Sequence, residues 1–155
     1  MNTPLRIIAG DFDDPRVIAL LARHFAAMRS TGPEESCHVM PLDAMRRADL
    51  DFFAAWEGEI LAGFGAIKRL GDDHGEVKSM HTAAARRGQG VGQAVLDHLL
   101  AHARAAGLQR LSLETGAGDV FVPARALYAR NGFEICAPFG DYKLDPNSVF
   151  MTRTL

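Results

Sequence analysis

A glycine-rich segment in the middle of the chain carries the residue types that bind a phosphate group. The stretch 86–92 reads Arg-Arg-Gly-Gln-Gly-Val-Gly. It follows a strand-like run, residues 76–82, and precedes a helical pattern of apolar residues that recur every four positions from Val91 to Ala103. The glycines leave backbone N–H groups uncovered at the helix start, where the helix dipole favours an anion. With the charge of two arginines beside it, the segment predicts a pyrophosphate site.

The loop fits one phosphate-binding pattern and departs from two others. No Lys-Ser or Lys-Thr pair follows the glycines, as a mononucleotide P-loop requires, and a dinucleotide fingerprint needs a third glycine where Gln93 stands. Arg87, Gly90 and Gly92 do satisfy the pattern Arg/Gln-x-x-Gly-x-Gly/Ala. With it the chain resembles the GNAT family of acetyl-CoA-dependent N-acetyltransferases. The alternative is a glycine-rich turn that only caps a helix.

A second segment strengthens this resemblance. Residues 124–133 read Ala-Arg-Ala-Leu-Tyr-Ala-Arg-Asn-Gly-Phe, which is similar to the family's A-x-x-L-Y-x-x-x-G-F pattern near the C-terminus. The segment lies one strand beyond the glycine-rich loop, at the distance the family shows. Many members also carry an asparagine just before this helix that contacts the CoA arm. Here residues 119–123 read Asp-Val-Phe-Val-Pro, so that contact is not expected.

The resemblance implies acetyl-CoA as the cosubstrate, held by the end of the fourth strand and by the loop. The backbone N–H of Met80 would stabilise the oxyanion where the fourth strand parts from the fifth, and Met80 and Thr82 would bond the pantetheine arm as an added strand does. The residues implied to contact the cosubstrate are Met80, His81, Thr82, Arg87, Gly88, Gln89, Gly90, Val91 and Gly92.

Acetyl transfer to an amine needs a group that protonates the leaving thiolate and a group that takes the amine's proton. Tyr128 stands where the family's tyrosine does and is the candidate acid; its alternative role is to pack the last helix on the sheet. Glu76, which begins the fourth strand, is the candidate base. Its alternative role is a solvent-facing carboxylate paired with a neighbouring Lys or Arg.

Strand alternation predicts which side chains of the fourth strand act together. Period-two spacing places on one face Glu76, Lys78, Met80 and Thr82. His81 then lies on the opposite face and is interpreted as a structural residue. His74, in the turn before the strand, is a weaker candidate base.

The acceptor side is expected to form from residues 29–49 and 138–147. These segments carry acidic and aromatic side chains, namely Glu34, Glu35, Asp43, Asp141, Tyr142 and Asp145. Such a mixture would suit a small cationic amine, although surface loops are often acidic for solubility alone. The sequence does not distinguish an amino acid, a polyamine, an aminoglycoside or a protein N-terminus. A small molecule is favoured because the chain is too short to include a separate peptide-binding domain.

Composition bounds the class of protein. The 155 residues fit one domain, expected over residues 1–155, and 48% hydrophobic with 23% charged residues is ordinary for a globular enzyme. A formal charge of −2 without a basic run argues against a nucleic-acid partner. We expect no membrane helix and no signal peptide, and a cytoplasmic location in which Cys37 and Cys136 stay reduced. A homodimer is left open.

The predicted elements alternate between strands and helices. Strands are expected at 5–9, 52–56, 60–67, 76–82, 111–114, from 133 and at 150–154; helices are expected from 15, over 91–103 and over 123–130, with a short helix at 42–47. The order β-α-β-β-β-α-β-α-β-β predicts an α/β, GNAT-like three-layer sandwich. In it, helices cover both faces of a mixed, largely antiparallel sheet.

Two further interpretations concern a metal site and a function without catalysis. His98 and His102 have the i, i+4 spacing of a metal pair, but no third ligand is evident, so we expect no metal and place both histidines toward solvent. An acyltransferase is the favoured function. A CoA-binding sensor without turnover is the alternative, and it would need the loop but neither Tyr128 nor Glu76.

Overall fold

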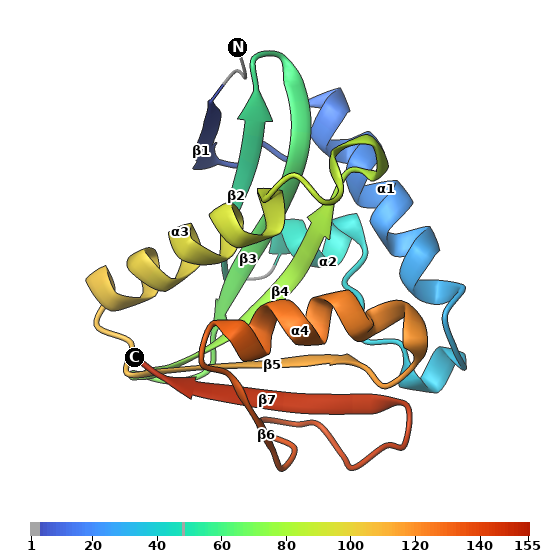
Figure 1. Cartoon of the computed structure of the whole chain (residues 1–155), viewed down its shortest axis with the longest axis vertical. Coiled ribbons are helices and arrows are strands. Elements are labelled where there is room, and N and C mark those ends of the chain that lie inside the picture. Colours follow the sequence, from blue (N-terminus) through green and yellow to red (C-terminus); the bar gives the residue numbers. More distant parts are fainter. Residues whose placement is uncertain (1–3, 48) are drawn as a thin grey trace.

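A seven-stranded mixed sheet crosses the molecule in the order β1-β2-β3-β4-β5-β7-β6 (Figure 1). The computed structural model describes residues 4–47 and 49–155. All neighbouring strands are antiparallel except β4 and β5, which run parallel. The strands are β1 (Leu5–Ala9), β2 (Leu50–Glu57), β3 (Ile60–Arg69), β4 (His74–Thr82), β5 (Arg110–Gly116), β6 (Glu134–Cys136) and β7 (Ser148–Thr154).

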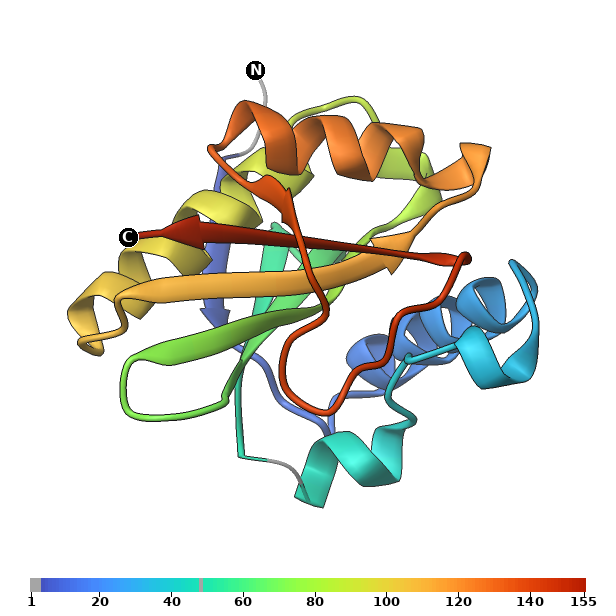
Figure 2. The same ribbon diagram turned by 90° about the horizontal axis from the view of Figure 1, so that it is seen from below.

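Helices cover both faces of this sheet, as Figure 2 shows from below. On one face lie α1 (Pro15–Arg29) and α2 (Leu42–Arg47), and on the other lie α3 (Val91–Ala105) and α4 (Val122–Arg130). Each face has its own apolar core, one built with α1 and α2 and the other with α3 and α4. The predicted three-layer α/β sandwich is therefore confirmed, including the short helix at 42–47. None of the helices in the described part of the chain combines the length and apolar character that crossing a bilayer requires.

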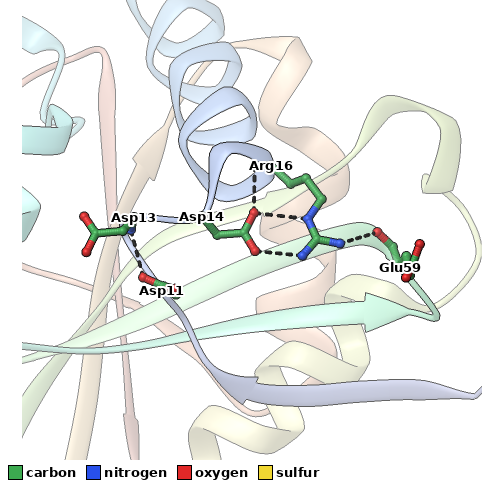
Figure 3. A network of polar contacts seen from close by, with 5 residues as sticks. All are labelled: Asp11, Asp13, Asp14, Arg16 and Glu59. Atoms are coloured by element: carbon green, nitrogen blue, oxygen red, sulfur yellow. Dashed lines mark hydrogen bonds and ion pairs between the residues drawn. The ribbon is translucent and has the colours of Figure 1, made fainter.

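The start of α1 is fixed by a polar network (Figure 3). Asp14 is the N-cap, and its Oδ1 accepts from the backbone N–H of Arg16 at 2.9 Å. The Arg16 guanidinium donates back to both carboxylate oxygens of Asp14 and, at 3.1 Å, to the carbonyl of Glu59. Because Glu59 lies in the β2–β3 turn, the cap also ties the first helix to that hairpin. A cap followed by proline at the first helical position was the signal that located this helix.

A β-bulge interrupts β4 at Ser79. Phe64 of β3 pairs with His81, but Ala66, two residues along, pairs with Lys78, so β4 carries one extra residue at this point. Ser79 has φ of +56°, the left-handed region that a non-glycine residue seldom adopts. An extra residue in one strand reverses the alternation of every side chain that follows it.

The predicted face of β4 is therefore wrong beyond Lys78. Glu76 and Lys78 point toward the β6–β7 loop, where both contact Tyr142. Met80 instead packs against the core on the α3 side, and Thr82 lies near Gly92 in the first turn of α3. His81 points to α1, on the same face of the sheet as Glu76, whereas period-two alternation placed it on the opposite face.

Strands β4 and β5 part after a short parallel ladder. They pair over His74–Glu76 and Arg110–Ser112, and the described residues show no pairing between them beyond that point. Both strands continue and diverge, β4 toward Thr82 and β5 toward Gly116, each still paired on its other side (Figure 1). Backbone groups along the two facing edges are consequently left for another partner.

Two histidines join α1 to the end of β4. Nδ1 of the buried His24 lies 3.1 Å from Nδ1 of His81, and Phe64 contacts both rings. Burial lowers the pKa of each imidazole from 6.5 to about 4, with a further lowering of the His24 pKa by His81. Both rings are therefore neutral at neutral pH, and one Nδ1–H donates to the other Nδ1.

Acid is expected to destabilise the fold through this pair. The unfolded chain binds these protons below about pH 6.5, whereas the folded protein binds them near pH 4. The contribution to the free energy of unfolding is complete above the unfolded pKa and is lost as the pH falls toward the folded pKa. The free energy of unfolding, measured with denaturant, should fall between about pH 7 and pH 5 in both proteins. The fall should be about 1–2 kcal/mol smaller in His24→Phe than in the wild type. Equal losses in the two proteins would contradict this assignment.

Candidate active site

The glycine-rich loop ends at the first turn of α3. Gly88 and Gly90 have φ of +74° and +86°, which glycine adopts without strain. Gly90 is the N-cap and brings no side-chain cap, so the N–H groups of Val91 and Gly92 have no partner within the helix. A Cβ at Gly88 or Gly90 would meet no described atom within 4 Å. The space beside these two glycines is therefore open to an anion that approaches the helix start.

The two arginines before the glycines differ in their surroundings. Nε of Arg86 lies 3.3 Å from Oε2 of Glu57 in β2, close enough for an ion pair but not aligned for a hydrogen bond within the described residues. Arg87 is exposed, and its charge contributes to the lowered pKa of His81. Of the pair expected to face the phosphates, Arg87 is thus the one whose guanidinium is not engaged by a described carboxylate.

Gln93 has a structural role that explains the departure from a dinucleotide fingerprint. Its side-chain amide exchanges two hydrogen bonds with that of Asn131, at 2.8 and 3.0 Å, and Asn131 also donates to the carbonyl of Leu127 at 2.7 Å. This link ties the first turn of α3 to the end of α4. Gly92 completes the contact, because a Cβ there would lie 3.3 Å from Leu127.

Tyr128 projects from α4 into the core on the α3 side and is 7% exposed. Its ring meets Phe133 edge to face at 5.8 Å, while no described residue hydrogen-bonds its hydroxyl. Burial raises the pKa of the phenol, and the negative charge of Glu114 raises it further. The phenol is therefore protonated at neutral pH. The ring packs the last helix on the sheet, which is the structural role predicted for Tyr128. The hydroxyl also keeps a proton, which the predicted role as an acid requires.

Glu76 is a buried carboxylate, 4% exposed, on the other face of the sheet. The hydroxyl of Tyr142 donates to Oε2 of Glu76 at 2.6 Å, and Nζ of Lys78 donates to the same oxygen at 3.3 Å. No described group donates to Oε1. The expected alternative of a solvent-facing glutamate is therefore wrong, although the pairing with a lysine is present.

Glu114 is a second acidic side chain at the point where the strands part, and sequence reasoning missed it. Ser148 of β7 donates to its Oε2 at 2.9 Å. Burial raises the pKa of Glu114, and the charge of Glu76 acts in the same direction. The signal was present in the strand itself, because Glu114 is a charged residue within an otherwise buried run of β5.

The two segments expected to flank the acceptor meet each other. Ser36 Oγ, in the 3-10 turn Glu34–Ser36, donates to Oδ2 of Asp145 at 2.6 Å, and the ring of His38 lies edge to face with Tyr142 at 4.9 Å. Figure 2 shows the β6–β7 loop passing to the α2 side of the sheet. Tyr142 and Asp145 are thus brought to this region. The remaining expected acids are exposed: Glu34, Glu35, Asp43 and Asp141.

The paired histidines of α3 lie elsewhere. His98 and His102 are half-buried against Phe53 of β2, and His102 Nε2 lies 2.8 Å from Oδ2 of Asp51, so both face solvent only in part. Among the described residues no three ligand side chains gather into a metal-binding group. The two cysteines, Cys37 and Cys136, are free thiols.

Comparison with known proteins identifies the class. The model of the Acetyltransferase (GNAT) family matches residues 16–133. The uncharacterized N-acetyltransferase YsnE of Bacillus subtilis is 45% identical over 151 residues, which are 97% of this chain and 100% of YsnE. The IAA acetyltransferase of Azospirillum brasilense is 39% identical over 125 residues, 79% of this chain and 80% of that protein. A crystal structure of a proposed acyl-CoA N-acyltransferase from Klebsiella pneumoniae superimposes with a TM-score of 0.79 at 31% identity over 99% of each chain.

The chain belongs to the GNAT family of acetyltransferases. Family membership makes it an acyltransferase whose acetyl donor is acetyl-CoA. Several solved structures of the same fold hold coenzyme A. The uncapped N–H groups at the start of α3 are the donors that the sequence predicts for the phosphates of such a cosubstrate.

Gly90→Asp is expected to weaken acetyl-CoA binding severely, because a carboxylate would enter the space in front of the N–H donors and repel the phosphates. Gly107→Asp is the matched control. Gly107 follows the other end of α3 with φ of +83°, close to the +86° of Gly90, and a Cβ at either position meets no described atom within 4 Å. The backbone strain is therefore similar in both variants. Calorimetry should show a large loss for Gly90→Asp alone, and equal affinities would overturn the loop assignment.

Arg87→Ala should weaken binding less than Gly90→Asp, because it removes one charged contact of about 1.5–3 kcal/mol and leaves the backbone donors in place. The loss should shrink as salt is added, since the guanidinium is exposed. Titration of acetyl-CoA at two ionic strengths measures both effects. A loss as large as that of Gly90→Asp would mean that the side chain, not the helix start, holds the phosphates.

Proposed function

We propose that this acetyltransferase moves the acetyl group of acetyl-CoA to the primary amine of a small molecule by direct attack within a ternary complex. The amine nitrogen forms the new bond to the carbonyl carbon as the carbon–sulfur bond breaks. The amine loses one proton, and the departing thiolate gains one. No acetylated side chain intervenes in this scheme.

The parting of β4 from β5 is the observation that carries the proposal. The ladder ends at Glu76 and Ser112, so the edges beyond it are free to bond the donor's arm as a strand would. Met80 lies on this edge, one residue after the left-handed Ser79. We assign the oxyanion to the backbone N–H of Met80, a type of donor worth roughly 10²–10³ in rate.

The candidate acid and the candidate base lie on the two sides of this opening. Tyr128 approaches from α4 with a protonated hydroxyl, and Glu76 lies on the face of the β6–β7 loop. The charge of Glu114 raises the pKa of Tyr128, and the charge of Glu76 raises the pKa of Glu114, so the three groups influence one another across the opening. We assign Tyr128 as the acid for the thiolate and Glu76 as the base for the amine.

The charge around Glu76 supports a cationic acceptor. Glu76 and Glu114 bring two carboxyl groups to the opening, and among the described residues the ammonium of Lys78 is paired with Glu76. An ammonium entering here would meet a surplus of negative charge in a poorly hydrated place, where electrostatic attraction is strong. Release of CoA thiol across a panel of acceptors tests the proposal. The panel should hold amino acids, polyamines, aminoglycosides, peptide N-termini and IAA, the compound in the name of one relative.

Thiol release with any small amine on the panel supports the proposal, and release with peptide N-termini or IAA alone would redirect it. Tight binding of coenzyme A without thiol release on any acceptor would favour a sensor. The matched blank is acetyl-CoA with enzyme and no acceptor, which measures hydrolysis of the thioester.

Glu76→Gln should lower turnover at neutral pH by about 10²–10⁴ if the carboxylate takes the amine's proton. The affinity for acetyl-CoA should stay near wild type, since Glu76 lies away from the loop. Glu114→Gln is the matched control, because it neutralises the other carboxylate of the opening. Should Glu114→Gln lose activity while Glu76→Gln keeps it, the role of base would pass to Glu114.

Tyr128→Phe keeps the ring in the core and deletes the hydroxyl. We expect turnover to fall by about 10- to 1000-fold while the fold and the acetyl-CoA affinity survive. Steady-state kinetics beside a thermal melt separates this from a packing role. Activity lost only in proportion to stability would mark Tyr128 as a core residue, and wild-type kinetics would mean that water protonates the thiolate.

A further inference from the structure

Tyr142 belongs to a surface loop but reaches a buried carboxylate. Its hydroxyl donates to Oε2 of Glu76 at 2.6 Å, and Nζ of Lys78 lies 3.2 Å from the hydroxyl oxygen and 3.3 Å from the same Oε2. The three groups form a closed triangle. Tyr142 is separated from Glu76 by 66 positions in the chain, so the contact exists only while the β6–β7 loop is folded against the sheet.

The loop is held there by contacts to both sides of the acceptor region. Asp145 accepts from Ser36 Oγ at 2.6 Å, and this bond lowers the pKa of Asp145. The ring of Tyr142 meets three other rings edge-on or tilted, at centroid distances of 4.9, 5.2 and 5.4 Å: those of His38, Phe139 and Phe150. His38 and Phe139 belong to the two segments that flank the acceptor and Phe150 belongs to β7, so Tyr142 is placed by both segments and by the sheet.

We propose that Tyr142 is a positioning residue for acetyl transfer, which fixes Glu76 as the proton acceptor and makes its orientation depend on the folded acceptor loop. This inference rests on the proposed function, because it takes Glu76 as the base. Oε2 is occupied by the phenol and the ammonium, and Oε1 is left without a described donor. The amine's proton then passes to Oε1 as the nitrogen lone pair attacks the carbonyl carbon.

The phenol can serve as a constant donor. Burial raises the pKa of Tyr142, and the charge of Glu76 raises it further, so the hydroxyl keeps its proton across the range in which an enzyme of this kind is assayed. A donor to a carboxylate favours the charged form. The other titratable groups around the triangle, which remain when Tyr142 is altered, are Lys78 from β4, Glu114 from β5, His74 at the start of β4 and His38 from the α1–α2 segment.

Tyr142→Phe tests the proposal through the pH dependence of kcat/KM. Loss of the hydroxyl removes a donor that favours the charged carboxylate, so the acid limb of the profile should move up by about one pH unit. At a pH below that limb the rate should fall about tenfold relative to wild type. Affinity for acetyl-CoA should not change. Leu144→Ala is the matched control, because Leu144 lies in the same loop and is exposed.

A double variant separates this inference from the proposed function. In a Glu76→Gln background, Tyr142→Phe should cause no further shift of the limb, since the carboxylate it acts on is gone. If Glu76→Gln has wild-type rates, the base assignment itself fails. If Glu76→Gln is impaired and Tyr142→Phe keeps the wild-type acid limb, the positioning role alone is overturned.

Ser36→Ala gives an independent measure should Tyr142→Phe fold poorly. It removes the bond to Asp145 that holds the loop and leaves the phenol in the chain. We expect a raised KM for the acceptor, a shift of the acid limb in the same direction and an unchanged affinity for acetyl-CoA. A wild-type acid limb in this variant would count against coupling between the loop and Glu76.

Discussion

The structure depends on the place where β4 stops pairing with β5. A continuous parallel ladder would close the sheet and leave no edge for the donor, whereas a ladder that ends at Glu76 and Ser112 opens it without exposing the core. The strands can diverge because each keeps its other partner, β3 for β4 and β7 for β5. The bulge at Ser79 then turns Met80 away from the face that Glu76 occupies.

Around this opening, the helices on the α3 side act as a rigid support. Gly90 begins α3 without covering its donors, and Gly92 lets Leu127 of α4 come close. The amide pair of Gln93 and Asn131 then locks the two helices to each other. Because Tyr128 lies on α4, this link also relates the candidate acid to the predicted phosphate site at the start of α3. Preorganisation of this kind is what positions a thioester for attack.

The order of elements could be predicted from the sequence because each had a local signal. Asp14 and Pro15 marked the start of α1, and the apolar repeat from Val91 located α3. The side-chain faces of β4 could not be predicted beyond Lys78. Period-two alternation assumes one residue per ladder position, and Ser79, with no glycine to announce a left-handed turn, breaks that assumption.

The polar contacts of the candidate site were the hardest part to predict from the sequence. Tyr142 was noted as an aromatic of the acceptor loop, but its bond to Glu76 joins residues far apart in the chain, and no short-range pattern encodes such a pairing. His24 shows the same limit. It sits in the apolar stripe of α1, where only the position of His81 on the bulged strand explains a buried imidazole.

The short ladder between β4 and β5 also divides the sheet mechanically. Among the described residues, a ladder of three residue pairs joins the β1–β4 part of the sheet to the β5–β7–β6 part, helped by the packing of α3 and by the contacts of the β6–β7 loop. By contrast, β5 and β7 pair over seven residues each. In the absence of ligand, the amides along the facing edges of residues 77–82 and 113–116 have no strand across from them to slow their exchange with solvent. A donor bonded to both edges, as we propose, would replace the missing ladder. The cosubstrate would then be part of the framework that keeps the two parts of the sheet together.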